Sequence, residues 1–464
     1  MTEPSTAEPS NAEPSNAEPS NAEPSTAEPP STPHNEAEAP ATTEGIPVLD
    51  EATVGGPTLE DGLLPCGLRV IIAQDATLPV AAVVLAIDTG TEDDPPSQPG
   101  LVHALAYHLL QGNRELTPAG AAALVHDRGG ITSLAVGPAQ VRYESLIPLS
   151  ALSEVLWAES QRLRAPTVSA ELWSSTLRWA RRDPSLKWRA PAEAMAAAHG
   201  MPGLAHDGRQ VPAALGQMVP RAIGQALAER FQYSAATLVV VSPHPPPRLR
   251  DAITEMFDTL PPATRHARDR MPRWRTGSVP QTLPLAKESG TRFVWPVAPH
   301  PAGLDQATVF CKAINRQRRR PGEPSRARLR CDLDEDPRRA TMTLRASGVD
   351  DPLALLTMRI ERLEQGEDES LVERQRQIVL RDRQQQLRSA LPLARRLSAA
   401  GPRDRTEPGW RTRPVAALTG LAVLSVPWTS RTFGPHLRPG AAIHLVPSQG
   451  KPKAKPKDHP EVQP

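Results

Sequence analysis

The strongest constraint on the fold is a regular change between two hydrophobic periods along the chain. Apolar residues run together over 67–73 and again over 79–88, as is typical of buried strands. Further on, Leu101, Leu105 and Leu109 recur at helical spacing, so a helix follows these strands. A similar order of strands and helices returns in the second half of the chain. The sequence therefore predicts an α+β protein of two successive halves, each a mainly antiparallel sheet packed with helices.

The same two patterns predict the remaining elements. Strands are expected at 131–136, 141–148, 236–242, 291–297, 340–346 and 441–447. Helices are expected at 118–128, 149–164, 170–182, 211–231, 248–260, 305–318, 353–365 and 370–399, the last of them long and charged.

Changes in amino-acid composition along the chain indicate where the two halves begin and end. Residues 1–57 form a tail rich in Glu, Pro and Ser, much of it a repeated pentapeptide such as EPSNA. Such a tract has almost no apolar surface to bury, so we expect it to be disordered. We expect a first domain at 58–262, a linker at 263–280 and a second domain at 281–447, followed by a loose Lys/Pro-rich tail at 448–464.

Charge and hydropathy limit which partners the protein is expected to bind and where in the cell it is expected to lie. The formal net charge is +1, and the positive charge is scattered along arginine-rich helices rather than gathered with aromatic residues, so nucleic-acid binding is not predicted. No apolar run approaches the roughly 18 residues of a membrane span, and the chain opens without a charged region and apolar run typical of a secretory signal. As written, the sequence predicts a cytoplasmic protein. If the start is misplaced and an export signal lies upstream, we expect a periplasmic or exported protein instead.

The three cysteines show no spacing that indicates disulfide bonds or a metal site. Cys66, Cys311 and Cys331 are odd in number, far apart and without C-x-x-C spacing. This pattern predicts neither a disulfide framework nor a cysteine zinc site.

Several segments in one frame resemble the M16 peptidases, the pitrilysin, insulinase and mitochondrial-processing-peptidase-like family. Leu64-Pro-Cys-Gly-Leu-Arg-Val is similar to the family's L-x-N-G-L-R-V strand. The run 88–103 resembles G-S-x-x-E-x-P-x-x-x-G-L-A-H, and 104–112 resembles F-L-E-H-M-L-F-K-G. Gly129-Gly-Ile-Thr-Ser resembles G-G-x-x-N-A. The resemblance covers about residues 58–447 and implies two successive homologous M16-type (LuxS/MPP-like) α+β domains.

The resemblance also defines what an active zinc site would need. Active M16 relatives bind zinc through H-x-x-E-H on a helix, where histidines at i and i+4 lie about 40° apart and the Glu is the general base. Here His103 holds the first ligand position, Ala106 the general-base position and Tyr107 the second ligand position. His108, at i+5, lies about 140° round the helix and shares a metal with His103 only across a π-bulge.

The third zinc ligand of the family, a Glu on a later helix, is also missing. Residues 174–182 match that helix, and Trp179 or a neighbour stands in place of Glu. Asp183 is the nearest carboxylate, but it precedes a proline. We therefore expect no catalytic residue, no bound metal and no other cofactor. His103 remains as a vestigial position, with His108 and Asp183 as weak alternative ligands.

In the family, a zinc-free subunit often pairs with an active one and supplies an Arg and a Tyr that hold substrate. Arg328 or Arg330 matches the arginine, whereas all three tyrosines lie in the first half of this chain. The arginines of 316–330 are interpreted as a solvated loop that faces the acids of 332–336.

These observations predict a non-catalytic pseudopeptidase that pairs with an active zinc M16 subunit, or with itself, around a peptide chamber. An alternative is a stand-alone peptide-binding or scaffold protein. A third reading is a metallopeptidase with a rewired zinc site.

Overall fold

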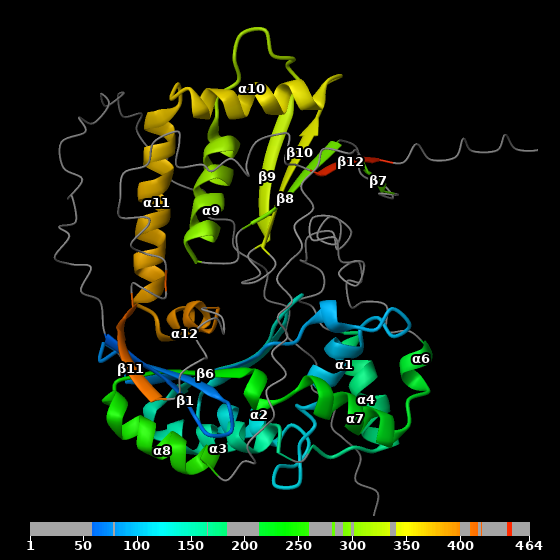
Figure 1. Cartoon of the computed structure of the whole chain (residues 1–464), viewed down its shortest axis with the longest axis vertical. Helices are drawn as coiled ribbons and strands as arrows, with labels where there is room; N and C mark the ends of the chain where they lie inside the picture. The colour runs from blue at the N-terminus through cyan, green and yellow to red at the C-terminus, as the bar shows by residue number, and fades with distance from the viewer. Residues whose placement is uncertain are drawn as a thin grey trace, which may run out of the picture. The chain divides into compact units, whose positions relative to one another are not determined.

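The computed structural model describes residues 58–77, 79–164, 166–182, 213–258, 281–283, 291–297, 301–334, 340–399, 409–415, 419 and 443–447. These parts of the chain form two β-sheets with helices packed against them, so the predicted α+β class is confirmed (Figure 1).

The first sheet has seven strands in the order β11-β1-β2-β6-β3-β5-β4. Neighbouring strands are antiparallel except β2 and β6, which are parallel. The strands are β1 (Thr58–Leu63), β2 (Arg69–Gln74), β3 (Val80–Ile87), β4 (Ile131–Val136), β5 (Val141–Pro148), β6 (Ala236–Ser242) and β11 (Gly409–Pro414).

Helices bury both faces of this sheet. Along β3, Val83 and Leu85 pack into a core with the helices of the first half, whereas Ala82 and Val84 pack against a helix from the second half, α12 (Ala390–Ser398). Burial on both faces explains why β2, β3 and β6 read as unbroken apolar runs. The helices of the first half are α1 (Leu101–His108), α2 (Gly120–Asp127), α3 (Leu152–Arg162), α4 (Ala170–Ala180), α6 (Ala213–Gly216), α7 (Pro220–Arg230) and α8 (Pro246–Asp258).

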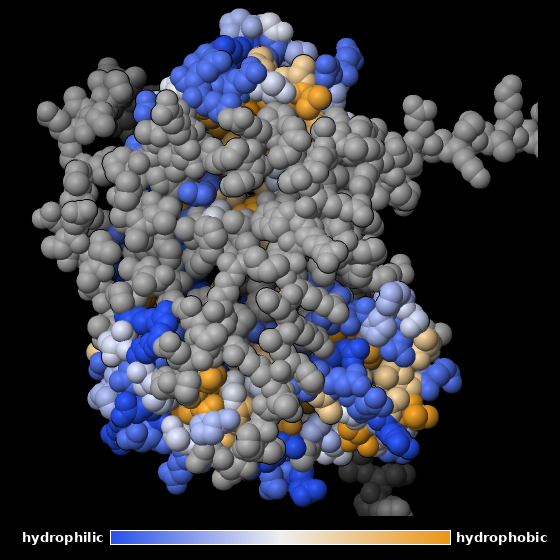
Figure 2. Space-filling model, viewed as in Figure 1, coloured by the Kyte–Doolittle hydropathy of each residue, from blue (hydrophilic) through white to orange (hydrophobic). Residues whose placement is uncertain are grey.

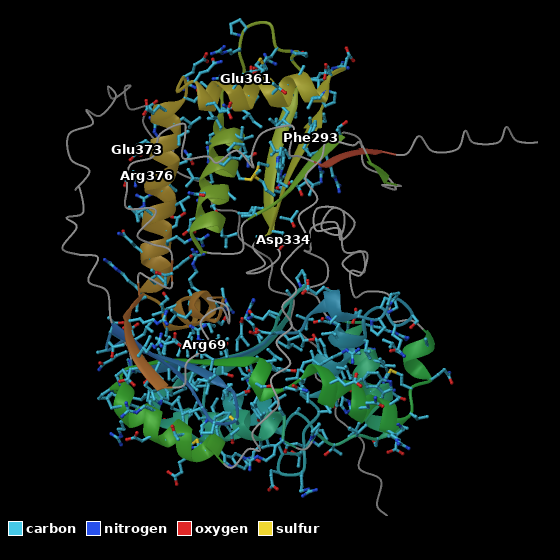
Figure 3. The ribbon with its side chains drawn as sticks, in the orientation of Figure 1. Arg69, Phe293, Asp334, Glu361, Glu373 and Arg376 are labelled. Carbon is cyan, nitrogen blue, oxygen red and sulfur yellow. A yellow bond between two sulfur atoms is a disulfide. The ribbon has the colours of Figure 1, made fainter. Side chains whose placement is uncertain are left out.

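The second sheet has five strands in the order β7-β12-β8-β10-β9. Its core lies between the sheet and helices, where Phe293, Trp295 and Leu344 are fully buried or nearly so (Phe293 is labelled in Figure 3). The elements are β7 (Gln281–Leu283), β8 (Thr291–Pro296), α9 (Pro301–Arg316), β9 (Arg328–Asp334), β10 (Thr341–Ser347), α10 (Pro352–Glu364), α11 (Glu369–Leu387) and β12 (Ile443–Pro447).

Most predicted elements match the structure, and 131–136, 141–148 and 236–242 coincide with β4, β5 and β6. The prediction of one helix over 370–399 is wrong. The backbone of Ser389 is extended (φ −114°, ψ 126°), so α11 ends there and α12 begins in a new direction. The reason is the apolar stripe of α12, which is buried against the first sheet. β11 is a strand of that sheet and α12 packs on one of its faces, so residues beyond 281 contribute to the first sheet and its core. The proposed domain boundaries stay a prediction.

Four strands were not expected from the sequence: β1, β7, β9 and β11. In β1, Asp61 is buried and accepts two hydrogen bonds from Arg69, at 2.8 and 2.7 Å (Arg69 is labelled in Figure 3). In β9, charged and apolar residues alternate from Arg328 to Asp334, which is itself a strand signal. The interpretation of 316–330 as a solvated loop is therefore wrong at its end, where Arg330 pairs with Asp332 on the same strand at 3.0 Å.

The cysteine prediction is also wrong. Cys311 on α9 and Cys331 on β9 form a disulfide with a Cα–Cα distance of 5.0 Å. The two residues are 20 positions apart in the sequence, and only the fold brings the helix and the strand together. Cys66 is buried in the core of the first sheet.

The described surface is largely hydrophilic in the view of Figure 2, with apolar residues in small separate groups. The exposed large apolar side chains lie on different elements: Ile131, Trp157, Trp179, Val219 and Leu353. Among the residues that the structure describes, no helix is both long and apolar enough to cross a membrane.

Candidate functional site around helix α1

Asp94 holds the start of α1. Its two carboxylate oxygens accept hydrogen bonds from the backbone N–H groups of Gly100 and Val102, each at 2.7 Å. These groups would otherwise be unsatisfied at the helix end. Gly100 has a φ of 83°, a backbone conformation that favours glycine. Burial raises the pKa of the Asp94 carboxyl to about 6, although the two N–H groups act in the opposite direction.

The residues at the M16 motif positions lie on α1 and are almost enclosed. His103 and Ala106 are each 0% exposed, and Tyr107 is partly exposed. The rings of His103 and Tyr107 are 5.2 Å apart. The carbonyl oxygen of Ala106 accepts a hydrogen bond from the Tyr143 hydroxyl at 2.8 Å. The general-base position is thus a buried methyl group next to a tyrosine that ties α1 to β5.

His108 contacts a different part of the fold from His103. Its Nδ1 lies 3.0 Å from Oγ1 of Thr176 on α4, and its Nε2 lies 3.0 Å from the carbonyl oxygen of Thr167. Trp173 packs edge-on against the ring, with centroids 5.6 Å apart. Burial lowers the pKa of His108 and favours the neutral imidazole. Nδ1 therefore joins α1 to α4, and Nε2 joins α1 to the segment that precedes α4.

The segment that the resemblance assigns to the third zinc ligand lies on α4. Trp179, at the expected ligand position, is 56% exposed. Thr176 instead faces α1 and is fully buried. The nearest candidate carboxylate, Asp183, lies outside the described residues. Sequence reasoning placed this helix correctly but missed Thr176, because a threonine carries no metal-ligand signal.

A buried ion pair supports the same region from α3. Arg162 donates two hydrogen bonds to Glu159, at 2.7 and 2.6 Å, and its guanidinium carbon lies 4.2 Å from the centroid of the Tyr143 ring. Burial raises the pKa of Tyr143, so its hydroxyl stays protonated and remains a donor to α1.

The first sheet ends at β4, beside α1. Within the described chain β4 is hydrogen-bonded on one side only, to β5. Ile131, the first residue of β4, is 58% exposed. On the neighbouring strand Glu144 is 2% exposed and is held by Arg142 at 2.9 Å and by Arg395 of α12 at 2.7 Å. Although burial acts against it, these guanidinium groups lower the pKa of Glu144.

The two arginines considered as substrate contacts lie on the second sheet. Arg328 and Arg330 are both exposed residues of β9, the outer strand next to β10. Arg328 donates to the backbone carbonyl groups of Ser325 and Ala327 at 3.4 and 3.2 Å. Among the described residues, no three His, Cys, Asp or Glu side chains are grouped so that they could hold a metal ion.

Comparison with known proteins gives the fold a name. No protein-family model matches the sequence, and no curated protein matches it significantly. Solved structures do match. A protease from Helicobacter pylori has a TM-score of 0.63 over 84% of this chain and 99% of that one, at 12% identity. A peptidase M16 inactive domain from Pseudomonas fluorescens has a TM-score of 0.62 over 83% and 97%, at 11% identity.

Larger M16-type proteins match over about half of their length. The periplasmic protease PqqL from Escherichia coli has a TM-score of 0.62 over 83% of this chain but 47% of its own, at 16% identity. A structure of the first half of PqqL is covered to 91%. The chain is thus an α+β protein with two sheets and helices against each. More specifically, it has the fold of M16 peptidases and the size of one half of PqqL.

Proposed function

We propose that this chain is a non-catalytic M16-type protein, a pseudopeptidase, that pairs with an active zinc-bearing M16 subunit to form or stabilise a peptide-processing chamber. The observation that carries the proposal is the set of side chains on α1. Ala106 has no group that accepts a proton, and a tyrosine, Tyr107, replaces the second histidine. Both ring nitrogens of His108 contact Thr167 and Thr176.

The burial of these positions supports the same reading. A catalytic zinc keeps one coordination position open to water. His103 and Ala106 have no exposed surface, so the first-ligand and general-base positions offer no such opening. Hydrolysis by a metal-activated water would also need a base within hydrogen-bond reach, and Ala106 supplies none.

The larger M16-type structures are consistent with pairing of two such units. This chain matches 47% of PqqL and 45% of pitrilysin, about half of each. We propose that a second M16-type unit, another chain or a second copy of this one, packs against it. An active zinc subunit is the partner we propose, because the proposed loss of zinc chemistry here leaves catalysis to the other half.

An added strand is the physical basis for peptide binding without a metal. The β4 edge presents backbone N–H and C=O groups that an extended peptide can pair with, as in other sheets that bind peptides. Ile131 offers exposed apolar surface at the start of that edge. Binding of this kind depends on β4 and not on His103.

Metal analysis tests the proposed loss of catalysis. The full chain is purified with and without added zinc, and its metal content and peptidase activity are measured. We expect less than about a tenth of an equivalent of zinc and no cleavage of extended peptides. Near one zinc per chain that disappears in His103→Ala would overturn the proposal and favour a rewired site. Recovery of a zinc-bearing M16 subunit with the tagged chain supports pairing; stable self-association without one favours the stand-alone binding protein.

A matched pair of variants tests the edge strand. Ile131→Lys places a charge on β4, whereas Val219→Lys places one at a position of similar exposure ahead of α7 (58% and 60%). We expect only Ile131→Lys to weaken binding of a fluorescent extended peptide. Equal effects of the two variants would argue against β4 as the binding edge.

A further inference from the structure

The disulfide links the outer strand of the second sheet to a helix. Cys311 lies on α9 and Cys331 on β9, and Figure 3 shows the bond in yellow between these elements. The two residues are 5% and 4% exposed. Their Cα–Cα distance of 5.0 Å is one that a disulfide spans without movement of the backbone.

An independent pair of hydrogen bonds holds the strand at the same point. Asn315 lies one turn after Cys311 on α9. Its Nδ2 donates to the carbonyl oxygen of Cys331, and its Oδ1 accepts from the N–H of Cys331, both at 2.8 Å. The backbone of Cys331 is therefore fixed against α9 by contacts that do not involve sulfur. Formation of the bond needs no rearrangement of the folded chain.

The bond also closes a strongly cationic segment. Residues 311–331 contain seven arginines, all of them exposed. Repulsion among these guanidinium groups works against an ordered loop, whereas a cross-link at both ends reduces the freedom of the unfolded segment. The covalent link thus restricts a segment of high positive charge at both of its ends.

We propose that the Cys311–Cys331 bond is a permanent structural cross-link and that the protein works in an oxidising compartment, outside the reducing cytosol. Disulfides persist where the surrounding thiol pool is oxidised and are rare in reducing cytosol. Burial shields this bond from small thiol reductants. Cys66, 1% exposed in the core of the first sheet, is equally shielded and does not act as an exchanging thiol.

The chemistry of formation is a two-electron oxidation. The two Sγ–H groups lose two protons and two electrons as the Sγ–Sγ bond forms. The electrons pass to the disulfide of a thiol–disulfide oxidoreductase, which takes up two protons and becomes a dithiol. This inference is independent of the proposed pseudopeptidase function, because it concerns residues of the second sheet and not the α1 region.

The test counts thiols in the protein as it occurs in its own cells. Cells are lysed under denaturing conditions in N-ethylmaleimide, and the intact mass of the full chain is measured before and after reduction. With three cysteines in the chain, we expect one adduct without reduction and three after it. Proteolysis should yield one linked peptide that contains Cys311 and Cys331. Three adducts without reduction would overturn the proposal.

A second measurement tests the structural role. Reductant should lower the unfolding temperature of the wild type and of Cys66→Ala by several degrees. The double variant Cys311→Ala/Cys331→Ala should already unfold at the lower temperature and should not respond. If reduction opens the bond but leaves the unfolding temperature of the wild type unchanged, the cross-link is not structural. The mass measurement decides the redox state even if the double variant does not fold.

Discussion

Ala106→Glu places a carboxyl at the position that the M16 resemblance assigns to the general base, and it tests how closed that part of α1 is. The position is 0% exposed and belongs to the core of the first sheet. A carboxyl buried there stays neutral by binding a proton in the folded state. In the unfolded chain the same carboxyl has a pKa of about 4.3, so each pH unit above that value lowers the free energy of unfolding by about 1.4 kcal/mol. The charge term therefore reaches about 3.7 kcal/mol at pH 7 and about 1 kcal/mol at pH 5.

The sign of the pH dependence follows from linkage. The carboxyl of the variant has a folded-state pKa raised above its unfolded value, so the charge penalty is absent below about pH 4 and grows as pH rises. Ala106→Gln is the matched control, because it adds a side chain of the same size without a charge. We expect it to cost about 1–3 kcal/mol for overpacking, with no change between pH 5 and pH 7.

The assay is denaturant unfolding of the wild type and both variants at several pH values. The free energy of unfolding of Ala106→Glu should fall below that of Ala106→Gln by a margin that widens with pH. Equal stability of the two variants at every pH would refute the burial argument. In that case the double variant Ala106→Glu/Tyr107→His should be tested for zinc binding.

Three further predictions concern contacts around α1. The pKa of Asp94, raised from 3.8 to about 6, gives a stability term that is complete below pH 3.8 and lost as pH rises through 6. This term is about 3 kcal/mol, and Asp94→Asn should remove its slope in unfolding measured from pH 3.5 to pH 7. The lowered pKa of His108 contributes to the free energy of unfolding above about pH 6.5, and this contribution is lost as pH falls. Thr176→Val should lower the free energy of unfolding by about 1–3 kcal/mol, because it leaves Nδ1 of His108 unsatisfied. An unchanged unfolding midpoint in this variant would contradict the contact. Tyr143→Phe removes the hydrogen bond to Ala106 and should cost about 1–2 kcal/mol in thermal unfolding without changing peptide binding.

Much of the fold could be predicted from the spacing of apolar residues along the sequence. The central strands β2, β3 and β6 are apolar on both faces, so their patterns are strong and their bounds were predicted closely. Strands with charged residues were harder to predict. The first strand, β1, lies between β11 and β2 and carries Asp61, which is buried and accepts hydrogen bonds from Arg69 of β2. In β9 the alternation of charged and apolar residues was visible, but the density of arginines favoured a loop.

The candidate site was only partly visible in the sequence. The identities of His103, Ala106 and Tyr107 and their spacing on one helix could be read directly. The partners of His108 could not, because Thr167 and Thr176 approach from later segments and are ordinary polar residues in the sequence. The disulfide was missed for the same physical reason, since only the packing of α9 on the second sheet brings its cysteines together.

The residues of α1 that differ from the M16 zinc motif are linked to one another by packing. Tyr143 contacts the helix backbone at Ala106 and stacks on Arg162, which is itself paired with Glu159. A Glu side chain at 106 would add volume and charge beside this arrangement, and a zinc site would still need a ligand from α4, where Thr176 binds His108. One substitution therefore does not restore the motif. The β4 edge lies one strand away from these contacts, because β4 pairs with β5 and Leu134 lies opposite Tyr143. We therefore expect a variant of Ile131, at the start of β4, to change peptide binding without changing the contacts of Ala106.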